Sequence, residues 1–230
     1  MMRYLAVLVF ALIAVLSCMW YLNSYREPEV QHIGYATAKD EFKAFTIAVR
    51  AWQDTARFAG FDYQEPRFVS KTDVKSKCYA YSEALNPFYC PADRTAYVSP
   101  KFKSYLERRG AKGNMALHLV IHHEVAHDLQ HQLGLLRKKQ RGNKGDSRLI
   151  ENMADCLAGY SMFYSHKKKN YMRQLSDTAE VVLALNAVGC RHSNCSHGSP
   201  EKRIKWFYEG FHKDGLQRCT AALNVQHIKE

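Results

Sequence analysis

Apolar and polar positions divide the chain into an apolar N-terminal segment and a longer region of mixed periodicity. Residues 4–22 contain no charged side chain, and a run of 19 such residues can cross a hydrocarbon layer of about 30 Å. Residues 40–58 carry apolar side chains at helical spacing, which predicts an amphipathic helix. Residues 65–70 and 95–99 predict two short strands, and the aromatic stretch 78–91 between them predicts an irregular loop.

The rest of the chain is predicted to be largely helical. Residues 115–133 contain no proline or glycine, with Asn114 as the expected N-cap and Gly134 as the expected stop. Further helices are expected at 101–109, 149–165, 171–188 and 200–211. Two strand segments followed by helices predict an α+β fold that is mostly helical with a small sheet.

Length and composition fit one globular domain with an N-terminal appendage. Of the 230 residues, 47% are hydrophobic, so residues 40–230 can bury a sizeable core. Residues 1–25 are predicted to be an apolar helix that serves as a transmembrane anchor or a signal segment, and residues 26–39 a linker. A lipoprotein-type cleavage would occur at Cys18, but the apolar run continues beyond it, which favours a retained anchor. We therefore expect a single-pass membrane protein whose domain lies on the periplasmic or extracellular side.

The cysteines agree with export. Seven are present, and six of them lie outside the apolar segment. An even number of cysteines is typical of a disulfide-bonded domain in an oxidising compartment. The candidates are Cys78, Cys90, Cys156, Cys190, Cys195 and Cys219. Six cysteines allow many pairings, and the residues alone do not choose among them.

The chain is basic, with a formal net charge of +11. Basic side chains gather at 137–148, which we predict to be a loop between two helices, and at 167–169. No nucleic-acid recognition motif accompanies them, so no nucleic-acid partner is expected. Anionic lipid head groups would suit a membrane-tethered basic domain, and plain solvated loops are the alternative.

A metal-binding pattern lies within the longest predicted helix. His123, Glu124 and His127 form the sequence H-E-x-x-H. Residues four apart project from the same face of a helix, so the two imidazoles can bind one ion. A catalytic zinc site has three protein ligands and an open position, and a neighbouring glutamate can act as general base. A third ligand is therefore required.

Glu151 is the best candidate for that ligand. His131 continues the i+4 series but lies about 12 Å along the helix axis from His123, too far to share an ion. A third histidine six residues after the second would stand at position 133, which is occupied by Leu133. Glu151 and Asp155 have i, i+4 spacing on a later predicted helix. Glu151 would complete the ligand set, and Asp155 would hold the outer N–H of a ligand histidine.

Several motifs follow one another along roughly residues 40–220. They are P-F-Y-C-P-A-D at 87–93, A-Y-V at 96–98, H-E-x-x-H at 123–127, E-x-x-A-D-C at 151–156, S-H-G-S at 196–199, Arg203, and W-F at 206–207. The order of these motifs resembles that in the bacterial membrane-associated neutral zinc metallopeptidases. The resemblance implies a zincin-like fold, a Zn²⁺ cofactor and the disulfides Cys78–Cys90 and Cys156–Cys219. Cys190 and Cys195 would remain as a small local loop.

His197 is a candidate for a second catalytic role. It lies in a glycine-containing turn just before Ser199 and Pro200, which are a typical N-cap and first helical residue. A histidine facing the metal can stabilise the oxyanion that forms when water attacks a carbonyl. A structural histidine that orients the turn is the alternative.

Together these features predict a membrane-tethered zinc metallopeptidase that acts on a peptide or protein substrate. Zinc bound by His123, His127 and Glu151 would activate water, and Glu124 would pass the water's proton to the leaving amine. One alternative is a membrane-anchored binding or chaperone-like protein that keeps zinc without turnover. Another is a zinc amidase that acts on cell-wall material.

Overall fold

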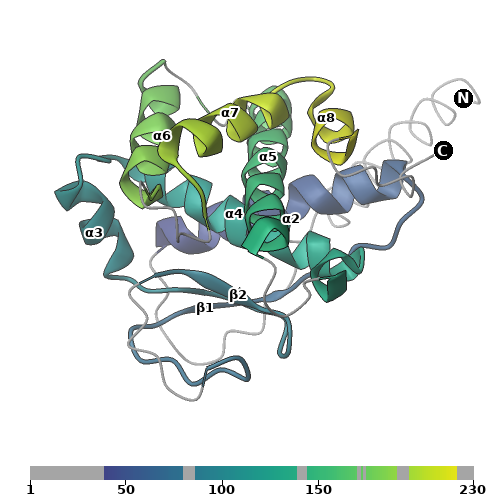
Figure 1. Cartoon of the computed structure of the whole chain (residues 1–230), viewed down its shortest axis with the longest axis horizontal. Helices are drawn as coiled ribbons and strands as arrows, with labels where there is room; N and C mark the ends of the chain where they lie inside the picture. The colour runs from purple at the N-terminus through teal and green to yellow at the C-terminus, as the bar shows by residue number, and fades with distance from the viewer. Residues whose placement is uncertain are drawn as a thin grey trace, which may run out of the picture. The chain divides into compact units, whose positions relative to one another are not determined.

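The computed structural model describes residues 39–79, 86–138, 144–169, 172, 175–190 and 197–221 (Figure 1). The predicted N-terminal helix and most of the linker therefore lie outside the described residues, as does Cys195. Among the described helices, none combines the length and the apolar character needed to cross a bilayer.

The described chain is mostly helical and contains a small sheet, in agreement with the predicted α+β class. The helices are α2 (Lys39–Phe58), α3 (Phe102–Arg108), α4 (Asn114–Gln132), α5 (Lys144–Lys169), α6 (Leu175–Val188), α7 (Pro200–Gly210) and α8 (Gly215–Ala221), with a 3-10 turn at Leu135–Lys138. The strands are β1 (Arg67–Ser70), β2 (Phe88–Cys90) and β3 (Thr95–Val98).

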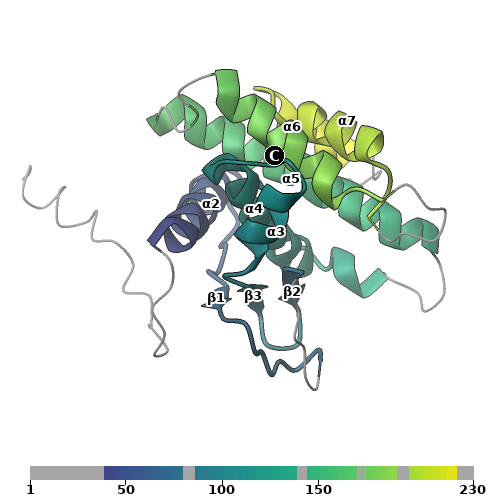
Figure 2. The same ribbon diagram turned by 90° about the vertical axis from the view of Figure 1, so that its left-hand side faces the viewer.

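The sheet contains one strand more than the sequence predicted. Its order is β1-β3-β2, with β3 parallel to β1 and antiparallel to β2 (Figure 2). The stretch 78–91 was expected to be an irregular loop, but its end forms the edge strand β2. Tyr97 and Val98 are buried on the central strand β3, which has β1 on one side and β2 on the other.

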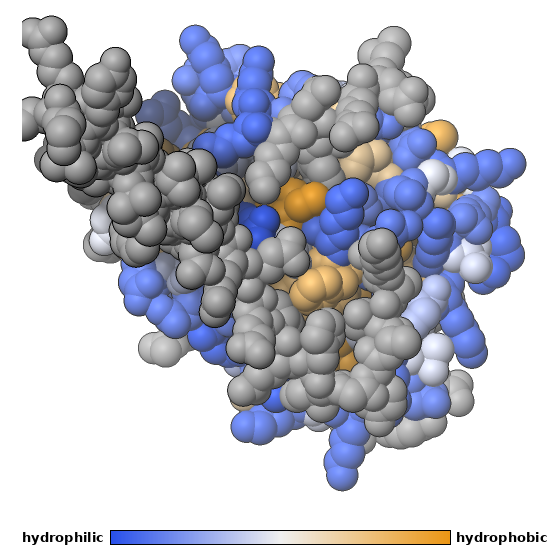
Figure 3. All heavy atoms as spheres, turned by 180° about the vertical axis from the view of Figure 1, so that it is seen from behind, coloured by the Kyte–Doolittle hydropathy of each residue, from blue (hydrophilic) through white to orange (hydrophobic). Residues whose placement is uncertain are grey.

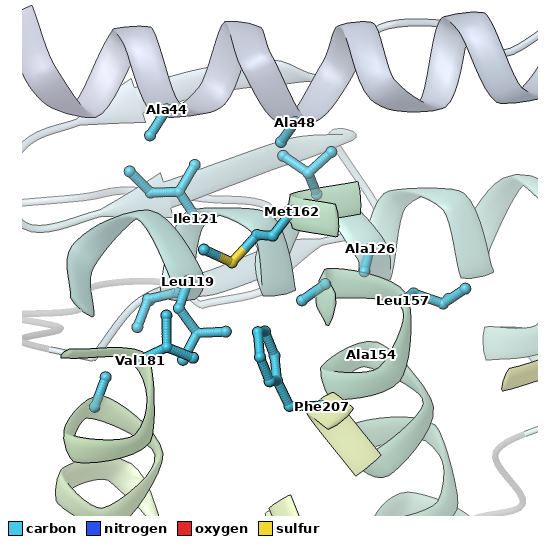
Figure 4. Packing of buried hydrophobic residues seen from close by; sticks show 14 of the residues in the cluster. Ala44, Ala48, Leu119, Ile121, Ala126, Ala154, Leu157, Met162, Val181 and Phe207 are labelled. Carbon is cyan, nitrogen blue, oxygen red and sulfur yellow. The ribbon is translucent and has the colours of Figure 1, made fainter. Parts of the chain in front are cut away.

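Helix α4 lies at the centre of the domain and is buried on nearly all sides. It contacts β2 and β3 on one side and α2, α5 and α6 on others. Ile121 packs near Ala44 and Ala48 of α2 and Met162 of α5, and Leu119 lies toward Val181 of α6 (Figure 4). The helix therefore holds its polar side chains inside the protein, where each one needs a partner.

The start of α4 differs from the prediction. Asn114 is the first helical residue, and Gly113 is the N-cap. Glu180 of α6 fills the capping role from outside, because its carboxylate accepts a hydrogen bond from the Met115 N–H at 3.0 Å. A local cap on Asn114 is therefore not needed, and its side chain instead accepts from Lys103.

Helix α5 is longer than predicted and packs tightly against α7. It begins at Lys144, so the described part of the expected loop 137–148 is a 3-10 turn and the first turn of α5. A Cβ added at Gly210 would come within 1.7 Å of the Cys156 carbonyl oxygen, and one at Gly159 within 2.2 Å of the Phe207 carbonyl oxygen. The two backbones thus touch at a point where no side chain fits.

Two disulfides join peripheral segments of the domain to strand β2 and to helix α5. Cys78–Cys90 ties the segment before β2 to the edge strand, and Cys156–Cys219 ties α8 to α5. Both were implied by the family resemblance. Hydrophilic side chains cover most of the described surface on the face shown in Figure 3, as the concentration of apolar residues in the core requires.

Candidate metal centre

Helices α4 and α5 bring three potential ligands together. His123 and His127 lie one turn apart on α4, with ring centroids 4.7 Å apart and rings nearly perpendicular. Glu151 comes from α5, which packs directly against α4. The ligand atoms of these three residues all lie within 4.8 Å of one another. Helical spacing on one element and packing of a second element thus produce a His₂Glu group.

A buried chain of charges holds His123. Its Nδ1 lies 2.8 Å from Asp155 Oδ1, so the ring donates that proton to the carboxylate. Arg203 of α7 donates to both oxygens of Asp155, at 2.8 and 2.7 Å. Burial opposes ionisation of Asp155, but the Arg203 guanidinium outweighs it and lowers the pKa of Asp155. The fixed N–H leaves Nε2 of His123 free to face the centre.

His127 is oriented by a neutral partner. Its Nδ1 donates to Gln130 Oε1 at 2.7 Å, and Gln130 Nε2 donates to the Ile150 carbonyl at 2.8 Å. The amide group therefore sets the ring tautomer and also links α4 to the residue before Glu151. This role of Gln130 was not predicted from the sequence, although a residue three positions after a ligand on a helix is a neighbour by spacing.

The arrangement of nitrogen and oxygen atoms fits a cation. Glu151 Oε2 lies 3.2 Å from His123 Nε2 and 3.4 Å from His127 Nε2. With the Nδ1 atoms held by Asp155 and Gln130, the two Nε2 atoms lie close to the Glu151 carboxylate, an arrangement that favours a positive charge between them. Burial opposes protonation of His123, yet Asp155 and Glu151 outweigh it and raise its pKa to about 10. Two imidazoles and one carboxylate are the donors of an open zinc site, so the residues fit zinc.

Glu124 lies beside this group without being part of it. It is only 6% exposed, and burial raises the pKa of its carboxyl group above the ordinary value. A cavity of about 160 Å³ is lined by Glu124 together with His123, Arg203 and His197. A carboxylate at the wall of a cavity that also reaches a metal ligand can exchange a proton with a molecule bound there.

His197 reaches the same centre from the turn before α7. Its Nε2 lies 3.3 Å from Glu151 Oε2, and its side chain is 48% exposed. Gly198 has a positive φ of 80°, which lets the chain turn sharply, and Ser199 then caps α7 by accepting from the Lys202 N–H. The ring is thus held beside Glu151 while one side remains open.

The other histidines of α4 lie away from the centre. His131 contacts the Tyr89 hydroxyl at 2.9 Å, in line with its exclusion as a ligand. His118 is buried, and α2 packs against α4. His122 points toward the Ser161 hydroxyl of α5.

Comparisons with known proteins bear on this site. A family model described as "Putative neutral zinc metallopeptidase" matches residues 22–222. The Uncharacterized protein YpfJ of Escherichia coli K12 is 29% identical over 209 residues, which cover 79% of this chain and 72% of YpfJ. The Uncharacterized protein Rv2575 of Mycobacterium tuberculosis H37Rv is 32% identical over 170 residues, which cover 64% of this chain and 58% of that protein. No solved structure matches.

Proposed function

Because the chain belongs to the neutral zinc metallopeptidase family, we propose that it is a zinc-dependent peptidase with a general base at Glu124. His123, His127 and Glu151 would hold the ion. The observation that carries the proposal is the convergence of these three donors beside a cavity lined by a buried carboxylate. A site that held zinc for structure alone would need neither the cavity nor the acid.

When bound, zinc supplies Lewis acidity that activates water and polarises the carbonyl of the substrate. Glu124 takes the proton of the attacking water and delivers it to the leaving nitrogen. Its raised pKa suits the first of these steps, because a weaker acid has a stronger conjugate base. His197 donates an N–H to the carbonyl oxygen as negative charge develops there. Asp155 and Gln130 keep the two ligand rings in one tautomer throughout.

The domain is proposed to be tethered to the membrane by residues 1–25 and to act on peptides or proteins outside the cytoplasm. The two disulfides support an oxidising location. The net charge of +11 supports a contact with anionic lipid head groups close to the tether.

Zinc content and hydrolysis of a generic protein substrate, measured together, test the proposal. Glu151→Ala should lose most of its zinc, because two histidines leave the ion under-coordinated. Glu124→Gln should keep its zinc and lose hydrolysis, and chelation should abolish hydrolysis by the unsubstituted protein. Undiminished zinc in Glu151→Ala would overturn the ligand assignment. Activity on cell-wall amides with none on protein would replace the peptidase by an amidase.

A further inference from the structure

Part of the cavity beside Glu124 is lined by apolar side chains, which define a recess. Beyond the site residues, the lining comprises Phe102 and Tyr105 of α3, Leu119 and Val120 of α4, Val188 at the end of α6, and Asn86 and Pro87 before β2. The volume of the cavity is about 160 Å³. An apolar cavity of about 150 Å³ in an unrelated protein admits a benzene molecule, so the cavity as a whole, site residues included, is large enough to admit a large side chain.

The walls are held in place before any ligand arrives. The rings of Phe102 and Tyr105 stack with centroids 5.3 Å apart. The Arg109 guanidinium lies 4.8 Å from the centroid of the Tyr105 ring and donates to the Ala187 carbonyl of α6. These contacts join α3 to α6 across the recess, so little ordering is left for a ligand to induce.

The charged groups of the lining do not favour a charged ligand. Arg203 is 5% exposed, and three of its N–H donors are engaged, two by the Asp155 oxygens and one by the Val188 carbonyl. Its charge is therefore already paired with a carboxylate. Glu124 is the one acidic residue among the lining residues, and the proposed reaction uses it. An apolar ligand leaves none of these groups without its partner.

We propose that this recess binds the side chain of the substrate residue that carries the leaving nitrogen, and that it selects a large apolar side chain of phenylalanine or leucine size. The inference rests on the proposed function for the direction of the chain. Glu124 delivers the proton to the leaving nitrogen, so a recess that opens beside Glu124 faces the half of the substrate that departs as an amine.

Binding without turnover gives the first test. The probes are hydroxamates HONH–CO–CH₂–CH(R)–CO–NHCH₃ in which R is benzyl, methyl or carboxymethyl, measured by calorimetry on the zinc-loaded protein. The benzyl compound should bind at least about tenfold more tightly than the methyl compound, and carboxymethyl should gain nothing over methyl. Equal binding of benzyl and methyl compounds would overturn the proposal.

Two variants locate the effect within the recess. Val188→Phe fills the space and should abolish the benzyl preference, whereas Leu183→Phe, on the same helix but 44% exposed, should preserve it. Tyr105→Ala enlarges the space and should favour a naphthylmethyl side chain over benzyl. The control Tyr208→Ala removes an exposed tyrosine and should leave the preference for benzyl unchanged. If Val188→Phe and Tyr105→Ala both behave as their controls do, the preference arises elsewhere and the assignment fails.

Cleavage of a mixed peptide library, read by mass spectrometry, tests the direction. Large apolar residues should be enriched at the new N-termini of the products. Enrichment at the new C-termini would overturn the assignment to the leaving half. If no peptide is cleaved while the benzyl preference persists, the proposed peptidase function is wrong, but the recess still selects a large apolar side chain. If peptides are cleaved without a side-chain preference, the proposed peptidase function is supported and the proposed selection by the recess is wrong.

Discussion

The pairing of Arg203 with Asp155 allows a quantitative prediction about stability. The two side chains are 6% and 0% exposed and share two hydrogen bonds. Arg203→Met keeps an apolar stem in the space but leaves Asp155 with His123 as its remaining charged partner among the described residues. Breaking a buried pair from one side typically costs about 3–5 kcal/mol. For a domain of this size, that lowers the melting temperature by about 6–20 °C.

The assay is urea denaturation in the presence of a chelator and with disulfides intact, so that loss of zinc does not contribute. Arg218→Met provides a matched control, because it breaks an ion pair whose side chains are 45% and 39% exposed. That change should cost less than about 1 kcal/mol. The double variant Asp155→Leu/Arg203→Met should be less destabilised than the sum of its single variants, by about 0.5–3 kcal/mol. If Arg203→Met costs no more than Arg218→Met, the buried pair does not stabilise the site as argued.

Three further predictions concern other parts of the domain. His197→Ala should lower kcat by about 100-fold with little change in KM, zinc content or melting temperature. A variant that unfolds or loses zinc but keeps normal activity per folded, zinc-loaded molecule would show a structural role. Burial raises the pKa of Glu41, whose carboxylate accepts from the Ser70 hydroxyl, so wild-type stability should fall relative to Glu41→Gln as the pH rises from 4.5 through the raised pKa. Parallel urea titrations check this, and a difference that does not change with pH would contradict it. Thiol labelling of the unfolded, unreduced protein should leave the four cysteines of the two described disulfides unmodified, and their full labelling would contradict the oxidised state.

The sequence predicted those parts of the fold and site that depend on local spacing. The long helix that carries His123 and His127 was expected because periodicity and the absence of breakers act within one segment. The placement of Glu151 and Asp155 on one face of a helix was expected for the same reason, and both carboxylates contact His123.

What the sequence did not reveal depends on contacts between distant segments. Strand β2 is only three residues long, and its hydrogen bonds come from β3. Helix α8 is seven residues long and is attached through the Cys219 disulfide. Arg203 belonged to the family pattern, but its bond to Asp155 exists only because α5 and α7 touch at Gly210. His118 is likewise buried on α4, against which α2 packs, and no local signal indicated this burial.

The recess also has a consequence for how this protein could diversify. The metal donors and their buried partners come from α4, α5 and α7, whereas Phe102, Tyr105 and Val188 come from α3 and the end of α6. Substitutions at these three wall positions would change which side chain fits without displacing a ligand of the ion. A descendant of this sequence could therefore acquire a new preference in a single mutational step while the residues of the proposed hydrolytic chemistry remained unchanged.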